Sequence, residues 1–324
     1  MKRRDLLALA GAVALGARAA PRPFRIYMVT WRGITDVERG FQAYLAEHGV
    51  PVEYVWRDAA QERDRLPAFV REAREMRPDL VYTWGTPATL GMAGTYDAPI
   101  ALGVPLVFAL VADPVGSHIV PRLAAPGRDV TGVFHVAPAA AQIHAIRAYR
   151  TFRRLGVLYN PAEANSVAVV RALREELRRD SGELLEARFA TDASGEPLAQ
   201  GVEERVEGLR RDGAEWLYLG PDTFLFTQLA RVAATAQSLR LPTFAATESL
   251  IDSPAPVLAG LVSRYREVGA FAAYKAQQIL ERRAAAHDLA VETLTRFSFV
   301  VRVEVARALD FLPPVTLFNY AEFR

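Results

Sequence analysis

The feature that most constrains the fold of this 324-residue chain is a regular alternation of short apolar runs with longer amphipathic segments. Four runs in the first half have the length and composition of strands: residues 24–29, 52–56, 80–84 and 105–110. Segments 36–48 and 61–76, and one that begins near residue 86, repeat apolar residues at helical spacing. Because strands that alternate with helices run parallel, the sequence predicts an α/β fold with a doubly wound parallel sheet.

The same pattern starts again in the second half of the chain. Its predicted strands are residues 155–159, 183–190, 216–219 and 243–246, and its predicted helices are 165–179, about 197–211 and about 223–239. Residues 126–140 contain glycines and prolines and are predicted to be a crossover between the halves. A mature chain of roughly 300 residues is at the size limit of one core. We therefore predict two doubly wound parallel-sheet lobes joined by a hinge.

The first residues have the layout of a secretory signal peptide. Lys2, Arg3 and Arg4 precede an apolar run, Leu6–Ala17, which ends at a small-x-small cleavage site near Ala19. The run is too short for the ~20 residues that a membrane-spanning helix needs. A buried N-terminal helix is the alternative, but prolines directly before the first strand disfavour it. The arginine pair also resembles a twin-arginine signal, which leaves the export route open.

Each part of the chain is assigned to the leader or to one of the two lobes. Residues 1–20 are predicted to be the signal peptide. Residues 21–137 form lobe 1, with a return segment at about 261–285. Residues 138–260 form lobe 2, with a C-terminal segment at about 286–324.

Composition and motifs exclude several classes of protein. Removal of the leader takes away four of the 39 basic residues and one of the 37 acidic ones, which leaves a net charge of about −1 and no basic face for nucleic acid. The absence of cysteine excludes disulfides, thiolate metal sites and a lipid anchor on an N-terminal cysteine. The five histidines show no metal-ligand spacing, and no P-loop, HExxH or GxSxG motif occurs. We therefore expect no cofactor, no metal and no catalysis. The sequence order is also compatible with a Ser–His–Asp set, although no motif selects one.

The ends of the predicted strands are the places to look for a binding site. In open parallel sheets, ligands bind beyond the carboxyl ends of the strands, and two facing sheets would make a cleft. The polar and aromatic residues at these ends lie around Trp31, Trp84, Asp113, Asn160, Asp222 and Glu248.

Several segments at these ends resemble one family of ABC-transporter substrate-binding proteins. They are Val111–Val115, Pro126–Val133, Gly156–Pro161, Pro242–Ala245 and Tyr265–Gly269. The resemblance covers essentially the whole mature chain in the right order. That family has the type I periplasmic-binding fold and includes receptors for tryptophan and tyrosine.

The chain also departs from the family pattern. Thr30-Trp31-Arg32 replaces the usual Gln and His after the first strand, and Asp222-Thr223 stands where an Asp-Asn pair is common. Arg302 stands where the family usually has Asn, and the C-terminal ending differs. These differences bear on the identity of the ligand more than on the fold.

Candidate polar ligand-binding residues lie at predicted helix starts. Thr86 begins a helix whose free N–H groups suit a carboxylate, and Asn165 with Ser166 offers the same chemistry from lobe 2. Each has a plain capping role as its alternative. Asp222, followed by Thr223, is the first candidate counter-ion for a ligand ammonium, with helix capping as its alternative.

The remaining candidates are an acid, two arginines and the aromatic residues. Glu248 is the reserve counter-ion. Trp31 and Trp84 would form an aromatic wall, with Tyr265 a weaker candidate, and packing beneath loops is their alternative. Arg32 or Arg302 could pair with a carboxylate.

The functional prediction is a periplasmic solute-binding protein of an ABC importer. It would close two lobes on an amino acid or related carboxylate, with an aromatic or branched side chain as one option. We expect a monomer that is free in the periplasm and contacts an inner-membrane permease transiently. A ligand-sensing component for a signalling partner is the alternative, because the same clamshell would serve it. A hydrolase is less favoured, and a transcription regulator would need a DNA-binding headpiece where the leader stands.

Overall fold

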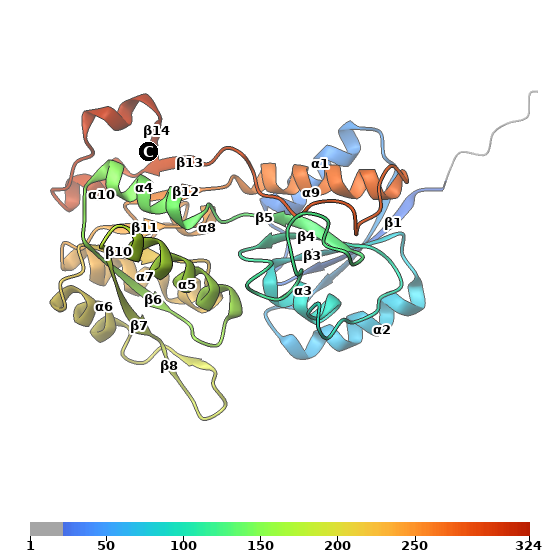
Figure 1. The fold of residues 1–324 in the computed structure, drawn as a ribbon, viewed down its shortest axis with the longest axis horizontal. Coiled ribbons are helices and arrows are strands. Elements are labelled where there is room, and N and C mark those ends of the chain that lie inside the picture. Colours follow the sequence, from blue (N-terminus) through green and yellow to red (C-terminus); the bar gives the residue numbers. More distant parts are fainter. Residues whose placement is uncertain (1–21) are drawn as a thin grey trace, which may run out of the picture.

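A computed structural model describes residues 22–324 and shows two α/β lobes side by side (Figure 1). The predicted signal peptide falls outside the described residues. Within residues 22–324, no helix combines the length and the apolar character needed to cross a membrane.

The first lobe is built on a five-stranded sheet that is parallel throughout. Its strands are β1 (Phe24–Thr30), β2 (Val52–Asp58), β3 (Leu80–Trp84), β4 (Leu106–Val111) and β5 (Val130–Phe134). Its helices are α1 (Asp36–Glu47), α2 (Leu66–Met76), α3 (Gly85–Ala93) and α9 (Tyr265–Leu280), with the short 3-10 helix η1 (Arg63–Arg65) before α2. The strand order is β2-β1-β3-β4-β5, so the direction of winding reverses between β1 and β3.

The second lobe is built on a seven-stranded sheet in the order β14-β13-β12-β11-β10-β6-β7. Its strands are β6 (Arg154–Tyr159), β7 (Glu183–Arg188), β10 (Trp216–Leu219), β11 (Thr243–Ala245), β12 (Ala259–Val262), β13 (Ser298–Val301) and β14 (Ala321–Phe323). From β7 to β12 the order is that of the first lobe, and winding reverses between β6 and β10. Only the β12–β13 pair of this sheet is antiparallel. The prediction of two doubly wound parallel-sheet lobes is confirmed.

Helices and a small hairpin complete the second lobe. The helices are α4 (Ala139–Tyr149), α5 (Ala164–Arg179), α6 (Val202–Arg211), α7 (Thr223–Ser238), α8 (Glu248–Ile251), α10 (Val303–Ala308) and the 3-10 helix η2 (Val315–Asn319). The hairpin pairs β8 (Ala190–Thr191) with β9 (Pro197–Leu198).

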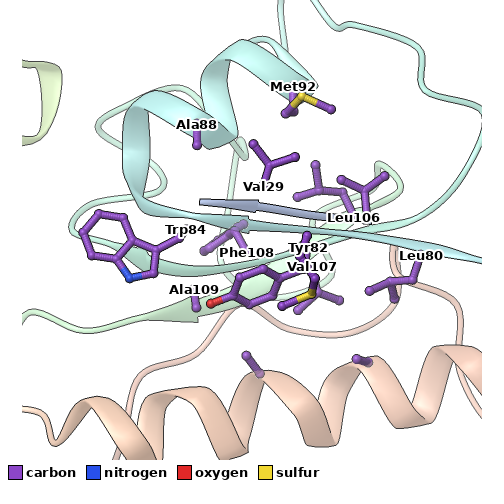
Figure 2. Close-up of a cluster of buried hydrophobic side chains, with 14 of the residues drawn as sticks. Val29, Leu80, Tyr82, Trp84, Ala88, Met92, Leu106, Val107, Phe108 and Ala109 are labelled. Carbon is purple, nitrogen blue, oxygen red and sulfur yellow. The ribbon is translucent and has the colours of Figure 1, made fainter. Parts of the chain in front are cut away.

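The central strands are apolar on both faces because helices cover both sides of each sheet. Every residue of β3 and of β4 is buried. Figure 2 shows part of this core, with Tyr82 and Phe108 among the central strands and Trp84 at the edge, where β3 ends. Because Trp84 lies where β3 ends, its ring can contribute both to the core and to a cleft beyond the sheet.

Helix α9 comes late in the sequence but packs on the first lobe, against α1 (Figure 1). The two helices approach so closely that a Cβ atom added to Gly269 would lie 1.8 Å from the carbonyl oxygen of Val37. A Cβ at Gly40 would lie 2.1 Å from the carbonyl oxygen of Arg266. Glycine on both helices therefore sets the distance between them.

Some local expectations differ from the structure. Residues 126–140, which were predicted to be only a crossover, contain the fifth strand of the first sheet, β5. The sequence did not reveal this strand because its short apolar run is flanked by turn residues on both sides. Helix α6 begins at Val202, since residues 197–198 pair in the hairpin.

The lobe boundaries stay a prediction, with one difference at the return segment. Thr131 of β5 donates to the carbonyl of Leu289 at 2.9 Å, and Phe134 donates from its backbone to Glu292. These hydrogen bonds place residues 289–292 beside the first sheet, although the predicted boundary assigns them to lobe 2.

Candidate functional site

A pocket lies between the lobes, beyond the carboxyl ends of the strands that flank both reversals of winding. It contains about 490 Å³ of space free of atoms, including the part open to solvent. Its walls come from both lobes and from the crossovers: Trp31, Arg32, Trp84–Pro87, Leu110, Ala112 and His135, then Asn165, Pro221–Thr223, Phe226, Thr247, Ser249, Leu250 and Tyr265.

Trp84 is held in place by the N-terminus of α1. Thr35 caps that helix in a capping box, in which its hydroxyl accepts from the Val37 N–H and the Glu38 carboxylate accepts from the backbone of Thr35. The same hydroxyl accepts a hydrogen bond from the Trp84 indole N–H at 3.2 Å. The orientation of Trp84 in the pocket wall therefore depends on a helix cap.

Glu38 extends this network into the core. Its carboxylate accepts a 2.6 Å hydrogen bond from the Tyr82 hydroxyl. Burial raises the pKa of Glu38, and the hydrogen bonds from Tyr82 and Thr35 oppose that rise.

Arg32 joins the two lobes across the pocket. Its guanidinium carbon lies 5.0 Å from the centre of the Trp84 ring of the first lobe and 4.4 Å from that of Phe226, on α7 of the second. Both distances are within the range of cation–π interactions. Phe226 is 37% exposed, so this contact is made on an otherwise open face.

A strained backbone position shapes the floor of the pocket. Leu110 has φ +56°, in the left-handed region that residues other than glycine seldom adopt. The pairing of β4 with β5 shifts register between Ala109 and Val111, at the same place. The resulting bulge interrupts the strand where it lines the pocket.

Two aromatic residues on separate crossovers meet at the back of the pocket. His135 lies between β5 and α4, Tyr265 begins α9, and their rings pack edge to face with centroids 6.1 Å apart. Burial, together with the charge of Arg32, lowers the pKa of His135 to about 4, although the hydrogen bond to Val111 opposes the shift. Since the Val111 carbonyl can only accept, Nδ1 of the neutral ring carries the proton in their 3.2 Å hydrogen bond. Nε2 is therefore a neutral acceptor.

Asp222 lines the pocket, but three protein groups already use its carboxylate. One oxygen accepts from the backbone N–H of Leu225 at 2.8 Å and so caps α7. The other accepts from the backbone N–H of Asn160 at 2.6 Å and from the Ser166 hydroxyl at 2.8 Å. These contacts match the capping alternative to the predicted counter-ion role.

Glu163 is a second buried carboxylate at the same helix start. It accepts from the backbone N–H groups of Thr223 and Phe224. Burial, and then repulsion from Glu163, raises the pKa of Asp222 to about 7. The first N–H groups of α7 are thus occupied by the protein's own acids.

Asn165 presents a neutral acceptor to the pocket. Its amide nitrogen donates to the Pro221 carbonyl at 2.5 Å and to Glu163 at 3.3 Å. The amide oxygen accepts no hydrogen bond from the described residues, so a ligand could donate to it. Ser166 lies behind Asn165, where its hydroxyl bonds Asp222 and does not line the pocket.

Glu248 also lies behind the pocket. Its carboxylate pairs with Arg264 at 3.1 Å and accepts from the backbone N–H of Tyr265 at 2.6 Å. Its contacts therefore position the first residue of α9. The Tyr265 hydroxyl donates to Ser249, which lines the pocket.

Trp31 and Thr86 complete the wall on the first lobe. Both are buried, and α3 begins beside Thr86 with no side-chain cap on its N-terminal N–H groups. The Trp31 indole N–H is buried without an acceptor among the described residues. Such a donor costs free energy unless a ligand or water pairs with it.

Seven of the nine predicted site residues lie together in the pocket wall: Trp31, Trp84, Thr86, Asn165, Asp222, Thr223 and Tyr265. Ser166 and Glu248 support it from behind, and whether any of the nine binds ligand stays a prediction. The nine residues do not include His135 or Phe226, and the sequence names Arg32 only as one of two arginines that could pair with a carboxylate. A signal existed for Arg32, since it directly follows a strand end, whereas Phe226 lies one turn inside a helix and His135 follows the strand that was missed.

Known proteins resemble this chain along nearly its whole length. The family model described as ABC transporter substrate binding protein matches residues 26–322. A tyrosine-binding protein of Clostridioides difficile (strain R20291) is 23% identical over 288 residues, which cover 87% of this chain and 79% of that protein.

Two solved structures share the fold. A conserved domain protein of Vibrio cholerae superposes with a TM-score of 0.79 and 21% identity, over 94% of this chain and all of that one. An ABC domain of Streptococcus pneumoniae in complex with L-Trp gives 0.78 and 20% identity, over 93% and 99% of the two chains.

Proposed function

The chain belongs to the family of ABC transporter substrate-binding proteins, and from this premise we propose that it is the ligand receptor of an ABC importer. It binds one small organic carboxylate between its lobes and closes on it. The observation that carries the proposal is the pocket, whose walls come from the corresponding strand ends of both lobes.

Closure follows from that geometry. A ligand that touches Trp84 on one side and Phe226 or Asn165 on the other makes its full set of contacts only when the lobes are close together. The closed form is then favoured by the difference in affinity between the two forms. Closure also removes the ligand from water.

The chemistry of the walls favours a carboxylate with an aromatic or apolar body. Arg32 supplies a planar cation suited to bidentate pairing with a carboxylate. The rings of Trp84, Phe226 and Tyr265 and the side chain of Leu250 supply an apolar surface. Relatives described as binding tyrosine or carrying L-Trp support a ligand of this size.

The setting we propose is the periplasm, with an inner-membrane permease as a transient partner and the receptor acting as a monomer that performs no catalysis. Two features support it: family membership and the layout of the first residues. A sensory role with a signalling partner would use the same clamshell, and neighbouring genes for a permease and an ATPase would favour transport.

The proposal predicts saturable binding of one small carboxylate per chain. A thermal-shift screen of the purified protein against amino acids, hydroxy acids, aromatic acids and small sugars should identify ligands that raise the melting temperature. At 100 times the dissociation constant, a ligand stabilises the fold by about 2.7 kcal/mol. Calorimetry then gives the stoichiometry. Stabilisation by sugars alone, or turnover of the bound ligand, would contradict the proposal.

A further inference from the structure

We infer that the ligand is an organic anion without an ammonium group, such as a 2-hydroxy acid with an aromatic or branched side chain, and not a zwitterionic amino acid. The inference rests on the proposed function and narrows its ligand class. It follows from the positive charge of Arg32 in the pocket and from the acids near the pocket, which are already bonded to protein groups.

The pocket contains a cation without a protein counter-ion. Within residues 22–324, Arg32 makes no ion pair or hydrogen bond, and its guanidinium lies over the rings of Trp84 and Phe226. Other partly buried arginines are paired, for example Arg57 with Glu72 and Arg264 with Glu248. A ligand carboxylate would supply the anion that Arg32 lacks.

A neutral donor lies in the same wall. Trp31, the neighbour of Arg32, is 96% buried and lines the pocket, and its indole N–H has no acceptor among the described residues. An oxygen of the ligand would satisfy this group. The Arg32 guanidinium and the Trp31 N–H together favour a negatively charged ligand that has several hydrogen-bond acceptors.

The acids near the pocket already accept hydrogen bonds from protein groups. Asp222 accepts from three protein donors, Glu163 holds the N-terminal N–H groups of α7, and Glu248 is paired with Arg264. A buried ammonium group needs a carboxylate that accepts its hydrogen bonds and balances its charge. Burying an ammonium group near the positive charge of Arg32 without such a carboxylate would cost free energy.

Two acceptors of the pocket wall that have no donor among the described residues carry no charge. They are Nε2 of His135, in the neutral ring, and the amide oxygen of Asn165. Neutral acceptors of this kind suit a hydroxyl donor. A 2-hydroxy acid differs from the corresponding amino acid only in carrying a hydroxyl in place of the ammonium group. Comparing the two therefore shows which of these groups the pocket prefers.

Calorimetry at pH 7.5 with matched pairs tests the inference. The pairs are phenyllactate with phenylalanine, indole-3-lactate with tryptophan, 4-hydroxyphenyllactate with tyrosine, and 2-hydroxyisocaproate with leucine. In the pair that fits best, the hydroxy acid should bind at least tenfold more tightly than the amino acid.

The outcomes separate this inference from the proposed function. An amino acid that binds as tightly as its hydroxy acid, or more tightly, would overturn the inference and leave the receptor role standing. If no organic acid and no amino acid bound at all, both would be overturned.

A charge variant tests the role of Arg32 itself. Arg32→Gln should weaken binding of the preferred hydroxy acid at least 30-fold, and Arg32→Lys should restore part of the loss. The control Arg171→Gln changes an exposed arginine on α5 and should leave affinity unchanged. Melting curves without ligand check that each variant folds, and unchanged affinity in a folded Arg32→Gln protein would overturn the inference.

Discussion

Asp222 shows that a residue can lie in a pocket wall and still have a structural role. It follows β10, as a ligand-binding acid would, and it also precedes α7 as a capping acid would. The structure gives its carboxylate three protein donors. Its position could be predicted from the sequence, but its partners Asn160 and Ser166 come from about 60 residues earlier and are defined only by the fold.

We therefore predict that Asp222→Ala lowers the free energy of unfolding by about 2 kcal/mol or more. Loss of a helix cap costs about 1 kcal/mol, and buried donors left without an acceptor add to that. Urea denaturation measures the change. Asp180→Ala, at the exposed end of α5, is the matched control and should stay within about 0.5 kcal/mol of the parent. Equal effects of the two substitutions would contradict the capping role.

Arg32 and His135 are residues whose importance depends on tertiary structure. Among 39 basic residues, the sequence singles out Arg32 only as one of two arginines that could pair with a carboxylate. It gains a specific position only because Trp84 of its own lobe and Phe226 of the other lie on either side of it. His135 likewise becomes a buried neutral acceptor only where two crossovers meet.

At the scale of elements, the contact between α1 and α9 fixes the first lobe. The helices are more than 200 residues apart in the sequence, and the crossover after β12 returns the chain to the first sheet. Gly269 faces the backbone of Val37 and Phe41, so no flexible side chain can move aside to accept a larger residue.

Gly269→Ala should therefore lower the free energy of unfolding by about 3 kcal/mol, at the upper end of typical overpacking costs. The control is Gly208→Ala on α6, where the nearest atom to an added Cβ is the end of the Arg211 side chain at 3.7 Å. That change should raise stability by about 0.5–1 kcal/mol, because alanine is the better helix former. A stabilising effect at Gly269 would mean that the helices are further apart than described.

At the scale of the whole molecule, the proposed closure would bend the three crossovers that join the lobes within residues 22–324. His135 lies on the first crossover, and Tyr265 begins the helix after the second. A second hollow between the lobes is lined by Arg63 of the first and Glu196 of the second, both exposed. These two residues therefore report on the separation of the lobes.

We predict that ligand shortens the distance between spin labels at Arg63→Cys and Glu196→Cys by more than about 2 Å. The sequence contains no cysteine, so labels attach only at the introduced positions. Double electron–electron resonance measures the distance with and without ligand. A pair within one lobe, Glu47→Cys and Arg63→Cys, should not change. An unchanged distance across the lobes under saturating ligand would show binding without closure.

The sequence by itself determined the strand–helix alternation, its repetition and the edge of each sheet where the site lies. These follow from local periodicity and from the rule that parallel strands end at the same edge, so seven of the nine predicted site residues lie in one pocket wall. Only the tertiary structure decided which polar groups remain free. Among residues 22–324, Asp222 and Glu248 are hydrogen-bonded to protein groups while Arg32 and the Trp31 N–H are not, because hydrogen-bond partners come from distant segments that only the packed lobes bring together.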